Sequence, residues 1–373
     1  MEIFIFIVVI VALIVVHELG HFLVAKLSGM RVDEFGLGYP PRVATIGHIG
    51  ETAITLNWLP FGGFVKIYGE NPSTELGAGS TEIGLPDPRA FGAQPRILQA
   101  LVLVAGITMN LLFAYVLITG ALVAGTPRVL APEEVSRATD AALAISGVLP
   151  DSPAERAGFT ISDTVISATD AHGSWRANDP ASFSDFIAAS GGRAIELNIK
   201  RGGSDESLTV IPVAGLVASN PTRYALGIEV ATIGIVSLSL PQAMLEGARL
   251  TWGATLLTAI GLWHFFYGIV TGHADLSQVA GPIGIAGVVG SASEGGLGAL
   301  LSIVAIISIN LALINLIPIP ALDGGRFLFV IIESIVRRPI KPSVARAMNA
   351  ASFVLLILLM LVVTANDIYR IVR

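Results

Sequence analysis

Residues 3–27 form an almost unbroken apolar run, and this run limits the possible folds more than any other feature of the chain. A helix needs about 20 apolar residues to cross a bilayer, so the run is long enough for one crossing. It also contains His17, Glu18 and His21. Ionisable groups at membrane depth cost about 3 kcal/mol each unless they face a cavity, an ion or one another. We therefore expect these three side chains to have a function.

The three side chains form the pattern His-Glu-x-x-His. Two histidines four positions apart on a helix point the same way, and their ring nitrogens can hold one zinc ion. Glu18 lies about 100° around the helix from His17, where its carboxylate can take a proton from a water molecule that the metal activates. The pattern predicts the active half of a zinc metalloprotease. The alternative is a set of polar residues held by their neighbours on a buried helix, which the membrane setting disfavours.

The composition indicates a membrane protein with a soluble insert, because 53% of the 373 residues are hydrophobic and only 13% are charged. The chain has no cysteine, so any zinc ligands must be His, Asp or Glu. No basic stripe indicates nucleic acid as a partner. The first apolar run lacks a basic leader and a small-residue cleavage site, so we expect it to remain in the mature protein.

Four stretches are long and apolar enough to cross a membrane as helices. They are residues 3–27, 97–124, 295–316 and 347–366. Basic side chains follow the first stretch at Lys26, Arg31, Arg42, Lys66 and Arg89. By the positive-inside rule this loop faces the cytoplasm, which places the N-terminus outside and the histidine motif near the cytoplasmic end of its helix.

The loop after the first crossing has the pattern of a membrane-associated β-loop. Residues 35–39 and 52–56 are typical of short strands, and the glycine-rich segment 60–66 follows them. Placed beside an active site, such strands could offer an unpaired edge to an extended substrate. A hairpin on the protein surface is the alternative.

Residues 125–243 have the composition of a soluble domain. Acidic residues outnumber basic ones 14 to 8 between Gly125 and Gly247. Residues 144–159 predict a strand, a turn and a short helix, and further short strands and one helix follow. This order resembles a bacterial PDZ domain, an α+β fold that could bind peptide C-termini as an added strand, and we expect the edge at residues 144–148 to be the site. The alternative is a spacer domain whose groove is idle.

Residues 250–271 are uncharged and contain the cluster Trp-His-Phe-Phe-Tyr at 263–267. Hydropathy alone would make this stretch a crossing. A crossing here would, however, place the basic residues that follow 295–316 on the wrong side of the membrane. We therefore expect residues 244–294 to form an interfacial or re-entrant segment, with His264 near the headgroups.

The end of the third apolar stretch carries a candidate third zinc ligand. Pro318 and Pro320 break the helix, which is tolerated at membrane depth only where protein or a cavity surrounds the backbone. Asp323 follows at once on a glycine-flanked turn, and a catalytic zinc site takes three protein ligands and leaves a fourth position open. The alternative is that Asp323 caps the next helix.

These observations predict a polytopic α-helical membrane protein with four transmembrane helices and an inserted PDZ domain on the periplasmic side. Residues 1–124 would hold the first two crossings and the β-loop, and residues 125–243 the PDZ-containing region. Residues 244–294 would form the interfacial segment, and residues 295–373 the last two crossings.

The motif at 17–21, together with Asn-x-x-Pro-x-Pro-x-Leu-Asp-Gly-Gly at 315–325, resembles the site-2 protease family of intramembrane zinc metalloproteases. The segments 62–66, 106–110 and 281–285 and the PDZ-like insert resemble its bacterial branch, which includes the regulator-of-sigma-E protease. Ile107 stands where that family commonly has proline. The insert has room for one PDZ domain, whereas well-known relatives carry two.

The resemblance implies roles for six residues. His17, His21 and Asp323 would bind Zn²⁺, and Glu18 would activate water. Asn110 and Asn315 would help to hold the substrate. The expected activity is regulated intramembrane proteolysis of single-span membrane proteins of the anti-sigma factor type, or of signal-peptide remnants, in a bacterial inner membrane.

A second hypothesis belongs to another class of protein. The chain could be a membrane scaffold whose PDZ domain captures peptide tails and whose zinc site is structural or vestigial. Glu18 distinguishes the two, because a structural site has no use for a general base. A zinc transporter is disfavoured because no further ligands line a path across the bilayer.

Overall fold

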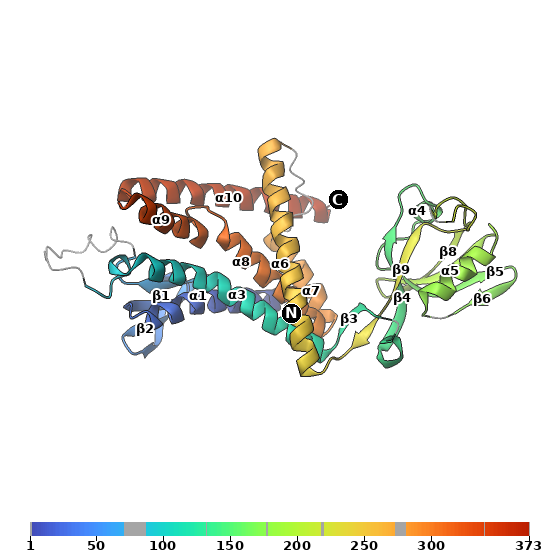
Figure 1. Cartoon of the computed structure of the whole chain (residues 1–373), viewed down its shortest axis with the longest axis horizontal. Helices are drawn as coiled ribbons and strands as arrows, with labels where there is room; N and C mark the ends of the chain where they lie inside the picture. Colours follow the sequence, from blue (N-terminus) through green and yellow to red (C-terminus); the bar gives the residue numbers. More distant parts are fainter. Residues whose placement is uncertain are drawn as a thin grey trace. The chain divides into compact units, whose positions relative to one another are not determined.

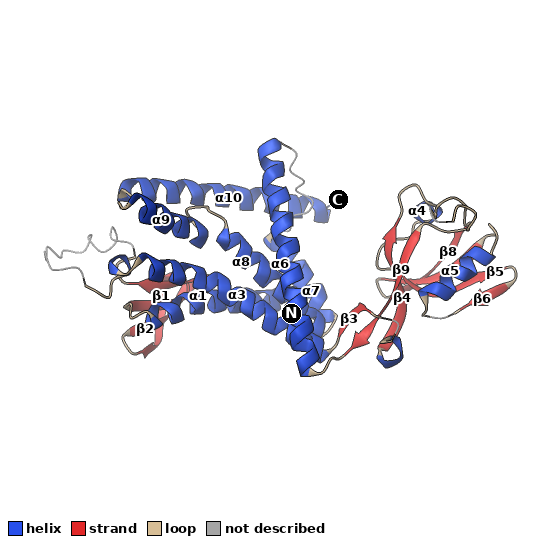
Figure 2. Ribbon diagram, in the orientation of Figure 1, coloured by secondary structure: helices blue, strands red, loops and turns tan. Residues whose placement is uncertain are grey.

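The computed structural model of the chain describes residues 2–70, 87–131, 133–176, 178–217, 220–272, 281–338 and 340–372. The chain divides into two compact units. The first combines Met1–Ala121 with Leu240–Arg373, and the second is Leu122–Ser239. The first unit is mainly helical and the second mainly strands (Figures 1 and 2). The second unit covers most of the predicted insert at 125–243.

Four helices in the described part of the chain are long and apolar enough to cross a membrane. They are α1 (Glu2–Leu27), α3 (Arg96–Ala124), α8 (Leu297–Leu316) and α10 (Pro342–Val372). Each coincides with one of the four predicted stretches. A helix satisfies its backbone polar groups internally, as lipid requires. With Ile107 in place of a proline, α3 runs without a break.

The loop after α1 is a hairpin of two long strands, β1 (Val32–Ile49) and β2 (Thr52–Ile67). Both are longer than the predicted strands, and β2 includes the glycine-rich segment. Residues 34–37 of β1 pair with residues 53–56 of β2 on one side and with residues 63–66 on the other. Among the described residues, the other side of segment 63–67 has no strand partner. This unpaired side is hereafter called the open edge.

The segment between the soluble unit and the third crossing forms two helices, α6 (Leu240–Thr271) and α7 (Pro282–Glu294). Residues 250–271 lie within one continuous helix, and the interfacial or re-entrant position of this segment stays a prediction. In Figure 1 α6 runs steeply across α1, α3 and α10. Its side chains His264, Phe265 and Phe266 line an apolar cavity of about 710 Å³ between α6, α8 and α10. His264 is exposed at the rim of this cavity, and its predicted place near the headgroups stays a prediction.

The N-terminus of α7 is capped by a residue from the far end of the chain. The carboxylate of Asp367, on α10, accepts hydrogen bonds from the backbone N–H groups of Gly281 (3.2 Å) and Gly284 (2.8 Å). A β-carbon on Gly281 would lie 2.7 Å from that carboxylate, so only glycine allows this approach. Val289 of α7 packs in turn against Val9 and Leu13 of α1. The motif at 281–285 therefore ties α10 to α7, and α7 to the helix that carries the histidines.

The helix α9 (Asp323–Val336) begins after a tight loop that follows α8. Gly324 and Gly325 lie against the backbone of this loop: β-carbons there would come within 2.3 Å of Leu316 O and 2.2 Å of Ile319 O. The Gly-Gly pair therefore allows the loop to fold back on the first turn of α9. Asp323 is the first residue of that turn.

The second unit contains one antiparallel sheet with the strand order β3-β9-β4-β5-β7-β8 and with β6 paired to β5. The strands are β3 (Thr126–Val129), β4 (Thr139–Val148), β5 (Thr164–Asp170), β6 (Gly173–Trp175), β7 (Ile195–Arg201), β8 (Ser204–Val210) and β9 (Ile228–Val236). The helices are α4 (Pro153–Arg156) and α5 (Pro180–Ala189). Alternating residues of β7, Ile195, Leu197 and Ile199, are fully buried in its core.

The prediction that residues 144–148 form an open edge is wrong. β4 lies inside the sheet, and its residues 144–148 pair with residues 228–231 of β9. The strand that covers it follows about 80 positions later in the chain, so a local pattern could not reveal it. β3 covers residues 233–236 of β9 on the other side. Among the described residues, segment 228–231 of β9 has no strand on that side.

Candidate metal centre

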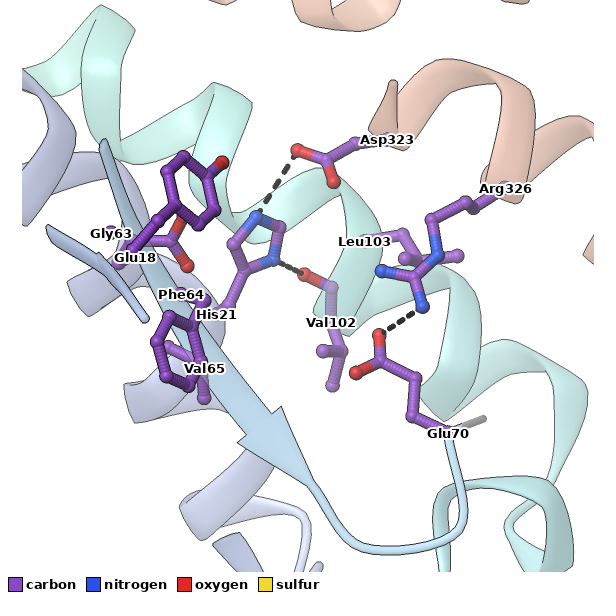
Figure 3. A pocket seen from close by; sticks show the side chains of 11 residues that line it. Glu18, His21, Gly63, Phe64, Val65, Glu70, Val102, Leu103, Asp323 and Arg326 are labelled. Carbon is purple, nitrogen blue, oxygen red and sulfur yellow. Dashed lines mark hydrogen bonds and ion pairs between the residues drawn. The ribbon is translucent and has the colours of Figure 1, made fainter. Parts of the chain in front are cut away.

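His17, His21 and Asp323 come together, although about 300 positions separate the histidines from the aspartate. The Asp323 Oδ2 atom lies 2.9 Å from His17 Nε2 and 3.1 Å from His21 Nε2. The two Nε2 atoms are 3.2 Å apart. Figure 3 shows His21 between Asp323 and the backbone of α3. The geometric condition for a shared ion, that the carboxylate faces the imidazoles, is met.

The hydrogen bond on the far side of His21 fixes its tautomer. Its Nδ1 lies 2.8 Å from the carbonyl oxygen of Val102, which can only accept, so Nδ1 carries the proton. In the neutral ring, Nε2 is then an acceptor that faces the acceptor Oδ2 of Asp323. Two acceptors at this distance repel each other unless a proton or a cation lies between them. The donor set therefore calls for a positive charge at the centre of the cluster.

The spacing of the three atoms fits zinc. Zinc bonds to nitrogen and oxygen are about 2.0–2.1 Å long, and tetrahedral angles then put two ligand atoms about 3.3 Å apart. The observed separations of 2.9, 3.1 and 3.2 Å lie within a few tenths of an ångström of this value. Burial opposes ionisation of Asp323, but its contacts with both histidines hold the pKa of the carboxyl well below its usual range. The ionised carboxylate is the form that binds a metal.

Asn110 lies behind His17 and is completely buried. Its amide nitrogen is 3.2 Å from His17 Nδ1, and its Oδ1 has no partner among the described residues. A 180° rotation of the Asn110 amide would exchange its nitrogen and oxygen atoms. In that orientation Oδ1 would accept the Nδ1 proton of His17, and His17 Nε2 would be free to bind a metal. Ser308 of α8 donates to the backbone oxygen of Asn110. This position indicates that Asn110 orients His17; a contact with substrate stays a prediction.

Glu18 directly follows His17 on α1, and its side chain lines a cavity of about 170 Å³ together with His21 and Asp323. The open edge contributes Gly63, Phe64 and Val65 to the same cavity. A β-carbon on Gly63 would lie 3.3 Å from Glu18 Cγ and 3.0 Å from Ile14 Cγ2, so this glycine lets the strand approach α1 closely. The cavity thus brings together the carboxylate of Glu18, two members of the cluster and the open edge.

Asp323 does not cap α9, although this was the alternative for that residue. The N-cap position is Leu322, and the contacts of the Asp323 side chain are to the two histidines. Asn315 is half-buried in the last turn of α8 and is not among the residues that line the cavity. Its predicted contact with substrate therefore stays a prediction.

Two glycines bring α1 and α3 close enough for the cluster to form. A β-carbon on Gly106 would lie 2.4 Å from His21 Nε2 and 2.8 Å from His17 Cε1. A β-carbon on Gly20 would lie 2.5 Å from the backbone oxygen of Ala105. These contacts would clash with ring atoms and backbone, which cannot move aside cheaply. Glycine in a membrane helix was the signal for these positions in the sequence.

Replacing Gly106 by Ala is expected to weaken zinc binding about 10- to 100-fold, because the added methyl group displaces both imidazoles from the metal position. Metal content of the purified protein, measured against a zinc-buffered series, checks this. Gly120→Ala on the same helix is the matched control, since its nearest neighbour is a leucine methyl at 3.7 Å. Equal zinc affinity in the Gly106 variant and the native protein would contradict the proposed packing.

The cavity also holds three polar residues that the sequence pattern did not single out, Tyr39, Glu70 and Arg326. Burial raises the pKa of Tyr39, and the negative charges of Glu18 and Asp323 act in the same direction. Its phenol therefore stays protonated and can donate a hydrogen bond. Glu70 and Arg326 form an ion pair (Figure 3). In the sequence, the feature that could have drawn attention to Arg326 is its position directly after Asp-Gly-Gly.

Known proteins that are similar to this chain are named as zinc metalloproteases. The chain matches the model of the family described as Peptidase family M50 over residues 5–359. A protein of Clostridium perfringens is 34% identical over 362 residues, which cover 96% of this chain and 95% of that protein. Zinc metalloprotease RasP of Geobacillus kaustophilus is 31% identical, covering 98% of this chain and 97% of its own. The PDZ domain of the SdrC-like protein from Listeria monocytogenes matches 25% of this chain and 90% of that domain, with 18% identity and a TM-score of 0.21.

Proposed function

Because this chain belongs to peptidase family M50, the site-2 protease family, and is an integral membrane zinc metalloprotease, we propose that it cleaves the transmembrane segments of single-span membrane proteins. The observation that carries the proposal is the depth of the site. His17, Glu18 and His21 lie within a helix that is long and apolar enough to span the bilayer. A peptide bond must reach that helix to be cut.

The proposed roles follow from the positions of the side chains. His17, His21 and Asp323 would hold zinc, which when bound supplies a Lewis acid that polarises oxygen and acidifies water. Glu18 lines the cavity beside them and would take the proton of the attacking water, then pass it to the leaving amine. The protonated phenol of Tyr39 would donate to the oxygen on which charge develops.

A transmembrane substrate is a helix, and its amides are engaged in their own hydrogen bonds. The substrate must therefore unwind locally before it is cut. The open edge, residues 63–67 of β2, carries backbone donors and acceptors that could pair with the unwound segment as an added strand. Such pairing would replace the hydrogen bonds that the substrate helix loses.

We further propose that the soluble unit binds peptide C-termini outside the cytoplasm, in the manner of a PDZ domain. Among the residues that the structure describes, segment 228–231 of β9 has no strand partner on the side opposite β4. A cavity of about 490 Å³ adjoins it, lined by Ala231 and Thr232 of β9 and by Pro180 of α5. The substrate would be an anti-sigma factor type of protein trimmed by another protease, or a signal-peptide remnant, in a bacterial inner membrane.

The test compares membrane fragments in cells that carry the native chain or its Glu18→Gln variant. Quantitative mass spectrometry of the membranes should find that single-span fragments, already trimmed on the outer side, accumulate in the variant cells only. A scaffold with a structural zinc site is the competing function, and it predicts the same fragment pool in both. Equal pools would overturn the proposed protease function.

A further inference from the structure

Glu70 and Arg326 connect two parts of the cavity that come from distant parts of the chain. Glu70 follows the open edge by three residues, and its Oε1 lies 2.7 Å from Nη2 of Arg326. Arg326 lies three residues after Asp323 on α9, which places the two side chains on one face of that helix, about a turn apart. Both members of the pair line the cavity with Glu18 and His21 (Figure 3).

The ion pair is more than a surface contact. The Glu70 side chain is only 11% exposed, and that of Arg326 is 34% exposed. A carboxylate at that depth needs a partner, because an unpaired buried charge is strongly unfavourable. Without Arg326, the turn after β2 that carries Glu70 would have to move toward water. The pair therefore fixes the end of the open edge relative to α9.

We propose that Glu70 and Arg326 are positioning residues for proteolysis: their ion pair holds the open edge at the distance from Asp323 at which a bound peptide presents its scissile carbonyl to the metal centre. This inference rests on the proposed roles of the cluster and of the open edge. Neither side chain takes part in proton transfer. The pair acts through the strand it tethers and through the helix that carries Asp323.

The test reverses each charge and then both. Arg326→Glu and Glu70→Arg each place two like charges together, so the strand end is pushed away from α9. The turnover number for a reconstituted single-span substrate is expected to fall about 10- to 100-fold, as a displacement of about 1 Å does in other enzymes. The double variant Glu70→Arg/Arg326→Glu restores opposite charges and is expected to recover turnover to within about threefold of native. KM should change much less than kcat, and zinc content should stay native.

A second ion pair on α9 gives a matched control. Arg96 of α3 lies 2.8 Å from Glu333 of α9, with side chains 39% and 17% exposed, but neither residue lines the cavity. Arg96→Glu should therefore leave kcat within about twofold of native. If it lowers kcat as much as Arg326→Glu does, the loss reflects general attachment of α9, and the positioning role is refuted.

The remaining outcomes are also decisive. Native kcat in a zinc-loaded Arg326→Glu variant, or no recovery in a zinc-loaded double variant, would overturn the inference. If the single charge reversals lose zinc, the neutral Glu70→Gln variant replaces them in the test. A fall in kcat of at least threefold with zinc retained then supports the positioning role of the ion pair. Native kcat in that variant refutes it. Failure of the proposed function looks different, because then the native protein itself cleaves no single-span substrate.

Discussion

Glu18→Gln is expected to lower the rate of proteolysis by about 10³-fold while zinc stays bound. Removing a general base costs about 10²–10⁴ in rate, and the cavity contains no second free carboxylate placed beside the cluster among the described residues, because Glu70 is paired with Arg326. Glutamine has nearly the same shape as glutamate but cannot take a proton. The measurement is cleavage of a reconstituted single-span substrate, with zinc determined on the same preparation.

Glu246→Gln is a suitable control for this substitution, because that carboxylate is on α6 and, within the described part of the chain, forms its ion pair with Arg249 on its own helix. It should cleave at the native rate. A Glu18→Gln protein that retains more than about a tenth of native activity would show that another group accepts the proton. The scaffold hypothesis predicts no change in peptide capture by either variant, so capture and cleavage should be measured separately.

His17→Ala or Asp323→Ala is expected to reduce zinc content from about one ion per chain to near zero. Each substitution removes one of three converging ligand atoms, and two ligands cannot hold zinc in a site that also needs an open position for water. The loss should exceed the 10- to 100-fold change that follows removal of an outer hydrogen-bond partner. Metal analysis after dialysis against a weak chelator measures it.

His264→Ala provides the control for zinc loss. This histidine is on α6 and lines the apolar cavity with α8 and α10, outside the cluster of possible ligands. Its zinc content should equal that of the native chain. Unchanged zinc in both the His17 and Asp323 variants would refute the ligand set, whatever the cleavage assay gives.

The helices could be predicted from the sequence because their signal is local and strong. A stretch of about twenty mainly apolar residues has no alternative to a helix in lipid. All four predicted stretches are helices in the structure. Spacing of four likewise places His17 and His21 on one face. That Asp323 joins them required the family resemblance, since no local pattern relates positions about 300 residues apart.

What the sequence pattern missed depends on which strands and helices become neighbours. The hairpin pattern predicted short strands, but residues 34–37 pair on both sides, which a period of two cannot indicate. Residues 144–148 were wrongly predicted as an open edge because the sequence pattern does not show that β9 pairs with them. A glycine at position 106 of a membrane helix indicates close packing, but the sequence does not show that the imidazoles are what packs against it.

The cap that Asp367 provides for α7 sets an order in which parts of the fold can form. Asp367 lies on α10, 86 positions after Gly281, and α7 packs on the helix that holds the first two histidines. The amides at the start of α7 can therefore meet their carboxylate only after the segment with Asp367 has been synthesised. Until then, the helix that packs behind the histidines lacks its N-terminal cap.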